Sequence, residues 1–321
     1  MHSLYYIENN RQTDITPIVG SISWTSHVDQ LGQSLDFDIA YNDDRFFPIN
    51  PINLGGLIVL RNNNEILRAI VLSETRSGRG SIAYTAMDYM FYLNKSQAVY
   101  QFNGLAASKS IAKILNDFAI PIGNITPMNK SIDKIYKETV SDIIKDIILQ
   151  AEQETGTKYH MEMREGKLYI EPQNVLEVVP VFKIASNLPD QLGIDYISKP
   201  QRKRSIEEMR NSIQVVAGDD VIATVKNDAL IKQYGILQKI ENVDETDIAQ
   251  AQNIAKNLLK ELGKIFEQNS VEMPGDDQVR AGKIIAIVEP VTGMNGKYLI
   301  ESVSHSLANG IHKMKLALEV I

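Results

Sequence analysis

The spacing of apolar residues changes twice along the chain, and this change limits the fold more than any other feature of the sequence. From residue 15 to residue 92, apolar side chains alternate with polar ones, as in Leu35, Phe37, Ile39 and Tyr41. A period of two is typical of strands that bury one face. We therefore predict a meander of about six strands in this region.

Between residues 98 and 175 the period becomes helical. The first apolar stripe falls at i, i+3, i+4 and i+7 and consists of Ile111, Ile114, Leu115 and Phe118. A second stripe follows from residue 139, and Gly156 is predicted to end that helix. Alternating residues then predict a hairpin over residues 159–172. This region is expected to form a small α+β unit.

The last third of the chain returns to short apolar runs with one helical interruption. A long helix is predicted over residues 247–266, and Asn309-Gly310 between alternating runs predicts a terminal hairpin. We therefore predict a β-rich α+β fold in three parts. These are a first β-module (1–97), an α+β insert (98–175, divided into 98–135 and 136–175) and a second β-module (176–321).

The two β-modules contain similar sequences. The segment 54–60 and the segment 280–288 each place a glycine before an aliphatic strand, and each is followed by a turn, a strand, a tip and another strand. Such an echo indicates a duplicated β-unit, although β-meanders also resemble one another by chance. If the unit is duplicated, the meander from Leu57 to Tyr92 in the first module is equivalent to the meander from Lys283 to Val320 in the second.

Composition excludes several classes of protein. The 321 residues include no cysteine, which rules out disulfide scaffolds, thiolate metal sites and thiol nucleophiles. Acidic residues outnumber basic ones by 40 to 33, so the net charge of −7 disfavours specific binding of nucleic acid. No stretch approaches a membrane span and the first residues do not resemble a secretory signal, so we expect no membrane insertion and a cytoplasmic site of synthesis.

The sequence offers little for catalysis or metal binding. No two histidines have the i, i+4 spacing of a helical metal motif. His305 and His312 face each other across the predicted terminal hairpin, but the sequence places no carboxylate beside them as a third ligand. The adjacent pairs Asp43-Asp44, Asp219-Asp220 and Asp276-Asp277 lie in predicted loops, where aspartate usually binds backbone donors. We therefore predict no catalytic residues, no metal and no cofactor.

Two other clusters have alternative interpretations. Lys199 with the run 202–204 is the best candidate for a basic patch, but a solvated loop explains it more simply. An aromatic group could stack on sugars, although alternating aromatic residues in strands usually belong to the core. Its members are Tyr84, Tyr89, Phe91, Tyr92, Tyr100 and Phe102.

Three segments give the chain a family resemblance. They are the run SIEEMRNSIQVV at 205–216, the stretch 100–121, which is similar to a LysM repeat, and the C-terminal segments 298–305 and 314–320. With these segments and the order of its parts, the chain resembles the XkdQ/YqbQ-type baseplate hub proteins of contractile phage tails and phage-tail-like bacteriocins, which are related to late control gene D proteins.

The resemblance implies two tail-tube-like antiparallel β-barrel modules and a structural role without enzymatic activity. It implies a homotrimer that joins the hexameric tail tube to the trimeric central spike, contacts other baseplate proteins and lets DNA pass through its lumen. Assembly would take place in the host bacterial cytoplasm, followed by incorporation into the tail baseplate. The expected barrel-forming or oligomer-forming strand residues are Leu57, Val59, Ile285, Ile287, Leu299 and Leu316.

A different class of function remains open from the sequence. The LysM-like stretch and the acidic pairs would suit a tail-associated protein that binds or degrades peptidoglycan, for which Asp219 or Asp276 would be the catalytic candidates. A third interpretation is a β-rich protein of unrelated function that shares only the meander pattern.

Overall fold

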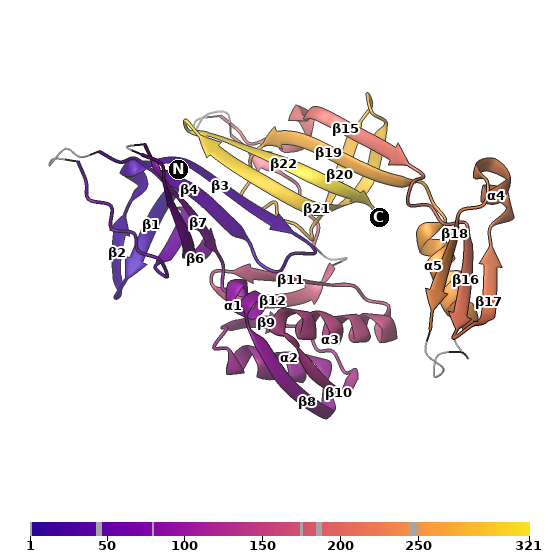
Figure 1. Ribbon diagram of the computed structural model, residues 1–321. Helices are drawn as coiled ribbons and strands as arrows, with labels where there is room; N and C mark the ends of the chain where they lie inside the picture. The colour runs from indigo at the N-terminus through magenta and orange to yellow at the C-terminus, as the bar shows by residue number, and fades with distance from the viewer. Residues whose placement is uncertain are drawn as a thin grey trace. The chain divides into compact units, whose positions relative to one another are not determined.

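The computed structural model describes residues 2–42, 47–78, 80–173, 176–183, 188–243, 248 and 251–321. The chain forms two compact units (Figure 1). The larger unit combines the chain up to residue 200 with residues 270–321, and the smaller unit comprises residues 201–269.

Antiparallel pairing organises most of the strands. The principal sheet has 12 strands in the order β15-β19-β22-β21-β3-β4-β7-β6-β5-β1-β2, with β20 added beside β21. Its strands are β1 (Ser3–Glu8), β2 (Arg11–Asp14), β3 (Val19–His27), β4 (Ser34–Ile39), β5 (Leu57–Asn62), β6 (Asn64–Arg76), β7 (Ile82–Met87), β15 (Ser198–Ser205), β19 (Phe266–Pro274), β20 (Ile284–Glu289), β21 (Met294–Ala308) and β22 (Ile311–Val320). The predicted β-rich α+β class is confirmed. Among the described strands, the pairing runs from β15 at one end to β2 at the other, and these two end strands do not pair with each other to close a barrel.

Each β-module has its own hydrophobic core. The first core includes Trp24, Leu35 and Ile58, whereas the second includes Ile285, Ile287 and Leu316. The modules are joined directly, because β3 of the first pairs with β21 of the second and sets Trp24 opposite His305. Backbone hydrogen bonding therefore makes the two modules parts of one sheet.

The two meanders share an unusual local geometry. Gly55 and Gly282 both have positive φ, 81° and 82°, two residues before β5 and β20 begin. Each glycine N–H donates to the next strand, to Val71 O in one module and Ile300 O in the other, both at 2.8 Å. The register then shifts immediately after Val71 and immediately after Ile300. This correspondence supports the duplicated β-unit inferred from the sequence echo.

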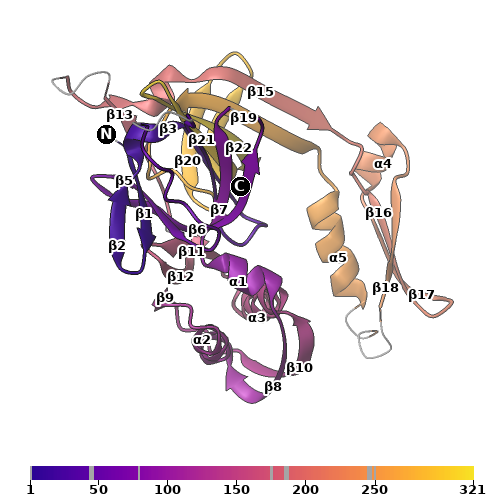
Figure 2. The same ribbon diagram turned by 60° about the vertical axis from the view of Figure 1, so that its left-hand side comes forward.

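The α+β insert is built around α2 and α3 (Figure 2). Its helices and strands are α1 (Met90–Lys95), β8 (Gln97–Ala106), α2 (Ala107–Asp117), β9 (Ile122–Ile125), β10 (Ser131–Thr139), α3 (Val140–Thr155), β11 (Tyr159–Arg164) and β12 (Lys167–Pro172). The apolar stripes predicted for the two helices are buried in one core, except that Phe118 is partly buried against it. Gly156 adopts φ 69° and ends α3 as predicted.

The start of the insert differs from the sequence prediction. Residues 90–95 form α1 instead of continuing the meander to Tyr92, and Met90 and Leu93 join the core of the insert. Asp88 explains the change, because its side chain accepts a hydrogen bond from Met90 N at 3.0 Å. This bond satisfies one of the free N–H groups of the first helical turn. The alternating aromatic residues predicted a strand here, and their spacing could not reveal the hydrogen bond from Asp88 that favours a helix.

The smaller unit is a three-stranded sheet covered by one helix. β16 (Ser212–Ala217) lies between antiparallel β17 (Asp220–Lys226) and parallel β18 (Gln238–Asn242), and α4 (Asp228–Tyr234) connects the outer strands. α5 (Ala251–Leu262) packs against β16 and β17 through Ala251 and Ala255. Part of the start of the predicted 247–266 helix lies outside the described residues. Its end is corrected, since the helix stops before Gly263 and Phe266 already begins β19. Shorter elements within the described residues include η1 (Thr16–Ile18), β13 (Val181–Phe182), β14 (Gln191–Leu192) and η3 (Gly193–Tyr196).

Asn211 holds the smaller unit together through polar contacts. Its fully buried side chain donates to Gly235 O at 2.7 Å and accepts from Leu237 N at 2.8 Å. We expect Asn211→Ala to destabilise this unit by about 2–3 kcal/mol, because two part-buried backbone groups lose their hydrogen-bond partners. Asn227→Ala, which removes only the cap on Leu230 N, should cost about 1 kcal/mol. Urea unfolding of both variants checks the order, and an Asn211→Ala effect no larger than that of Asn227→Ala would contradict it.

Candidate functional site

The six predicted strand residues separate into interior and boundary positions. Val59, Ile285, Ile287 and Leu316 are buried, while Leu57 and Leu299 are partly exposed. Ile285, Ile287 and Leu316 lie in the core of the second module. These side chains therefore stabilise the module itself, and their role in an oligomer stays a prediction.

A more accessible surface lies along the outer edge of β20. Among the described strands, β20 pairs only with β21. At its first residue the outer edge is covered, because Ile284 N donates to Leu176 O and Ile284 O accepts from Val178 N. Backbone groups alternate between the two edges of a strand, so the N–H groups of Ala286 and Val288 also point outward. We call this open segment, residues 286–288, the β20 edge.

Exposed apolar side chains accompany the β20 edge. Val288 is 70% exposed and Val291, in the loop that follows, is 87% exposed. Glu289 fixes this loop by accepting hydrogen bonds from Val291 N at 2.9 Å and from Thr292 N at 2.8 Å. A hydrogen bond from the Thr292 hydroxyl, together with the two backbone contacts, holds the pKa of Glu289 below its usual value. The loop therefore presents Val291 in a fixed conformation.

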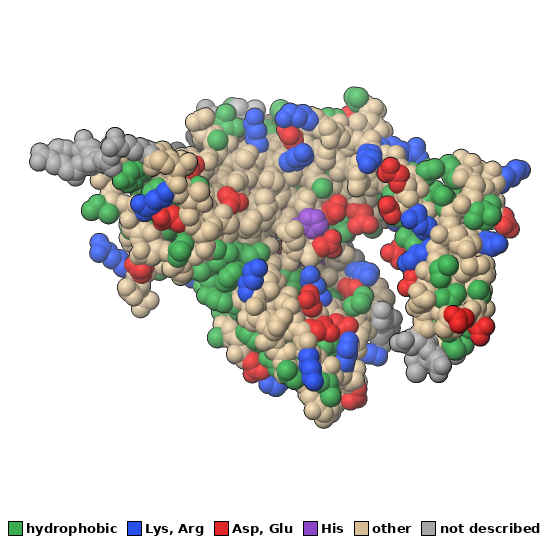
Figure 3. Space-filling view, in the orientation of Figure 1, with side chains coloured by type: hydrophobic (Ala, Val, Ile, Leu, Met, Phe, Trp, Pro, Cys, Tyr) green, Lys and Arg blue, Asp and Glu red, His purple; other side chains and the backbone are tan. Residues whose placement is uncertain are grey.

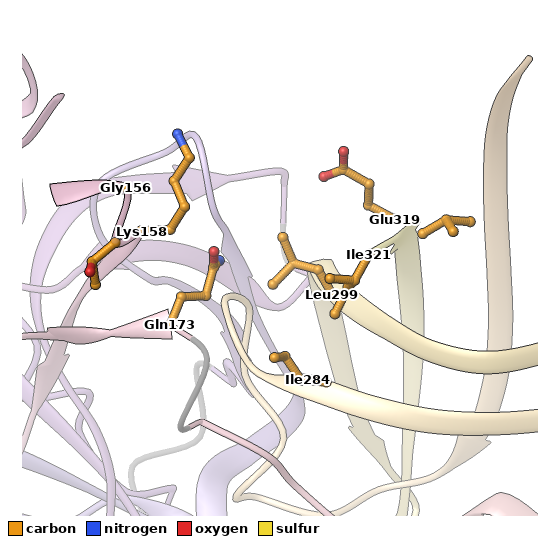
Figure 4. A pocket seen from close by; sticks show the side chains of 9 residues that line it. Gly156, Lys158, Gln173, Ile284, Leu299, Glu319 and Ile321 are labelled. Atoms are coloured by element: carbon orange, nitrogen blue, oxygen red, sulfur yellow. The ribbon is translucent and has the colours of Figure 1, made fainter. Parts of the chain in front are cut away.

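A cavity of about 400 Å³ lies between β20–β22 and the insert (Figure 4). Ile284 and Leu299 contribute apolar surface, and Lys158 and Glu319 supply its charged side chains. Lys158 is paired with Glu152 at 3.0 Å. The lining contains one carboxylate and lacks the pair of acids that glycoside hydrolysis requires.

The acidic pairs have different environments. Asp43 and Asp44 lie outside the described residues, and Asp219 and Asp220 are exposed at the turn between β16 and β17. Asp276 is buried and accepts from Val181 N and Gln278 N, which is the turn role expected from the sequence.

Asp277 is the exception among the paired aspartates. It accepts from His2 Nε2 and from Asn62 Nδ2, both at 2.8 Å. Burial opposes ionisation of Asp277, but the hydrogen bond and charge of His2 hold its pKa below the usual value. Sequence spacing could not reveal this contact, because 275 positions separate His2 from Asp277.

The basic segment is largely neutralised. Lys199 pairs with Glu272 at 2.8 Å, and Arg202 and Arg204 both pair with Glu267. Hydrogen bonds from Arg202 hold the pKa of Glu267 below its usual value. On the face of the larger unit drawn in Figure 3, basic and acidic side chains are interspersed. These contacts favour a solvated, neutralised segment over a basic patch. The predicted loop is wrong, however, because residues 198–205 form β15 and pair in the principal sheet.

The predicted aromatic group is mostly structural. Tyr84, Tyr100 and Phe102 are buried, whereas Tyr92 is 44% exposed. Tyr84 stacks on Phe37 and donates a hydrogen bond to Glu74 at 2.7 Å. These rings stabilise the cores of the first module and the insert, so a continuous sugar-stacking surface is not formed by them.

The terminal histidines meet as the sequence predicted. His305 Nδ1 lies 3.0 Å from His312 Nε2, and the His305 ring stacks on Trp24 with centroids 4.6 Å apart. Burial lowers the pKa of His305 to about 3 and that of His312 to about 4, so both rings are neutral at pH 7. The structure adds the carboxylate that the sequence did not place, since Asp277 Oδ1 lies 3.7 Å from His312 Nδ1.

This arrangement of a long antiparallel sheet and an α+β insert is a fold found in phage tail proteins. The chain matches the prophage MuSo2 43 kDa tail protein from Shewanella oneidensis with a TM-score of 0.71, 12% identity and 98% coverage of both chains. It also matches the E. coli c3393 protein, a component of the type VI secretion system with structural similarity to the T4 tail proteins gp27 and gp5. That match has a TM-score of 0.51 and 10% identity, and covers 95% of this chain and 74% of the other.

The YQBQ-like family model matches residues 22–319, and the chain belongs to this family. The phage-like element PBSX protein XkdQ of Bacillus subtilis is 24% identical over 98% of this chain and 96% of its own length. The B. subtilis protein YqbQ is 27% identical over 78% of this chain and 77% of its own. The family resemblance inferred from the sequence is confirmed.

None of the described helices combines the length and the apolar character needed to cross a bilayer.

Proposed function

We propose that the chain is the structural hub of a phage-like tail baseplate, where a homotrimer joins the hexameric tail tube to the trimeric central spike. The shared geometry of the two meanders carries the proposal. Three chains with two similar β-modules each would present six similar modules toward the tube and threefold symmetry toward the spike. The phage-like element protein among the relatives and the prophage tail protein among the structural neighbours support the same role.

The proposed role requires no chemical reaction. Asp219 lies on an exposed turn and Asp276 binds backbone donors, so neither favours the peptidoglycan-degrading alternative. A net charge of −7 suits a conduit, because a strongly basic lumen would retain DNA instead of passing it. Assembly in the bacterial cytoplasm and incorporation into the baseplate belong to the same proposal.

The β20 edge is our proposed contact between neighbouring subunits. An open strand edge with exposed apolar side chains can accept a strand from another chain. Ala286→Pro removes one outward N–H and leaves the hydrogen bonds to β21 in place, which proline permits at an edge. We expect this variant to keep its fold by circular dichroism while its association weakens at least about 10-fold, which is the effect of about 1.4 kcal/mol.

A matched variant separates hydrogen bonding from side-chain changes. Ala286→Thr keeps the N–H, so it should associate like the unmodified chain. Sedimentation equilibrium measures association for both variants. Equal association of Ala286→Pro and the unmodified chain would rule out the β20 edge as the contact.

The symmetry itself is tested by electron microscopy of the purified protein. Class averages should show a ring with a threefold axis and six similar lobes around it. Rings of another order, or rings without two similar lobes in each subunit, would contradict the proposed adaptor.

A further inference from the structure

Three histidines and one aspartate converge where the two β-modules meet. His2 precedes β1, His305 lies on β21, His312 lies on β22 and Asp277 follows β19. The His2 and His312 ring centroids are 4.9 Å apart. All these residues belong to the larger unit, and His2, Asp277 and His312 border the same surface hollow.

Hydrogen bonding determines which imidazole nitrogens carry protons. His305 Nε2 lies 2.9 Å from Val279 O, and a carbonyl oxygen only accepts, so Nε2 of His305 must donate. Nδ1 of the neutral His305 ring is then an acceptor, and His312 Nε2 donates to it at 3.0 Å. His312 Nδ1 therefore carries a lone pair.

That lone pair is directed toward a second acceptor. His312 Nδ1 and Asp277 Oδ1 are 3.7 Å apart, and two acceptors facing each other attract a cation. His2 Nε2 lies 2.8 Å from the same oxygen and donates to it, so a bound cation would replace the Nε2 proton, which is released to solvent or moves to Nδ1. The three possible ligand atoms are all within 4.8 Å of one another. Ligands of a tetrahedral zinc ion, at bond lengths of about 2.0–2.2 Å, are separated by roughly 3.4 Å.

Neighbouring side chains hold the three groups in place. His305 Nδ1 accepts a hydrogen bond from His312 Nε2, and Asn62 donates a hydrogen bond to Asp277 Oδ2 at 2.8 Å. Such outer contacts fix the tautomer and orientation of metal ligands. Glycine at position 275 leaves room for the His312 ring, because a Cβ atom there would lie 2.2 Å from that ring.

We propose that His2 Nε2, Asp277 Oδ1 and His312 Nδ1 bind a divalent transition-metal ion, with Zn²⁺ as the best match to two imidazoles and one carboxylate. The three ligand residues line the same surface hollow, so water from the hollow would complete the coordination. The ion would fasten the start of the first module to the β19 turn and to β22 of the second. The proposed ion has a structural role, and because all of its ligands come from one chain, the proposal does not depend on trimer formation.

The test uses the full chain without a histidine tag, treated with chelator and then dialysed. Calorimetric titration with ZnCl₂ should give one site per chain, and Zn²⁺ should raise the temperature of unfolding. We expect His2→Gln and Asp277→Asn to weaken Zn²⁺ binding at least about 10-fold. Co²⁺ in place of Zn²⁺ should give the visible absorption of a tetrahedral site.

The chain supplies a matched control. His27 also faces two carboxylates, Asp29 at 3.9 Å and Glu301 at 3.8 Å, but Asp29 is exposed and the other two residues are only partly buried. His27→Gln should leave Zn²⁺ binding unchanged. Because the His2 ring also contacts Trp24 and His312, circular dichroism of His2→Gln separates metal loss from misfolding. An absence of binding to the unmodified chain, or binding lost in His27→Gln and kept in His2→Gln, would overturn the proposal.

Discussion

Replacing Ile287 by aspartate is expected to unfold the second β-module. Ile287 has no exposed surface and lies within the core formed with Ile285 and Leu316. A carboxylate at this position would be buried without a partner, and such changes cost about 4–5 kcal/mol or more. Urea unfolding followed by circular dichroism measures the loss.

The next residue along β20 provides the control. Val288 is 70% exposed, so Val288→Asp should change the free energy of unfolding by no more than about 0.5 kcal/mol. If Ile287→Asp were as stable as Val288→Asp, the assignment of Ile287 to the core would be wrong. The pair also separates folding from assembly, because Val288 belongs to the β20 edge: a defect of tail assembly in Val288→Asp with unchanged stability would report a lost subunit contact.

The second large effect concerns the pH dependence of stability. Asp88 is buried, and its carboxylate accepts from Gln33 N at 2.8 Å and Met90 N at 3.0 Å. Burial raises the pKa of Asp88 from 3.8 to about 7, despite these hydrogen bonds and the charge of Arg280. The folded protein therefore keeps a proton on Asp88 that the unfolded chain releases.

The direction of the effect follows from that difference. Stability contributed by Asp88 is fully present below pH 4 and falls as the pH rises from about 4 to about 7, by on the order of 4 kcal/mol in total. Asp88→Asn cannot ionise, so this decline should be absent from its unfolding curves. Asp219→Asn, which alters an exposed turn, should retain the decline.

Urea unfolding at pH 5 and pH 8 checks this prediction. The unmodified chain should lose stability between the two values relative to Asp88→Asn. Parallel stability profiles for the two proteins would show that Asp88 ionises in the folded state as it does in the unfolded chain.

Local signals in the sequence predicted much of the fold. Gly156 ends α3 with positive φ, and Asn309 and Gly310, with φ of 52° and 76°, join β21 to β22. These features depend on a few neighbouring residues and on the conformational freedom of glycine and asparagine. The glycines at 55 and 282 are predictable for the same reason.

Features built from distant residues were not predictable. α1 depends on Asp88, whose partners include Gln33, 55 positions away. The histidine pair was visible because a hairpin joins its members, but Asp277 and His2 reach it only through the tertiary fold. Which residues of β20 face the core and which edge of the strand is open could not be predicted either, because both depend on the strands that lie beside β20.

The native mass of the purified chain, measured by light scattering over a concentration series, tests the hub most directly. We predict a mass near three times 36.0 kDa that falls toward 36.0 kDa on dilution. A monomer at every concentration, or a stable assembly with a number of chains that is not a multiple of three, would contradict a hub that trimerises by itself.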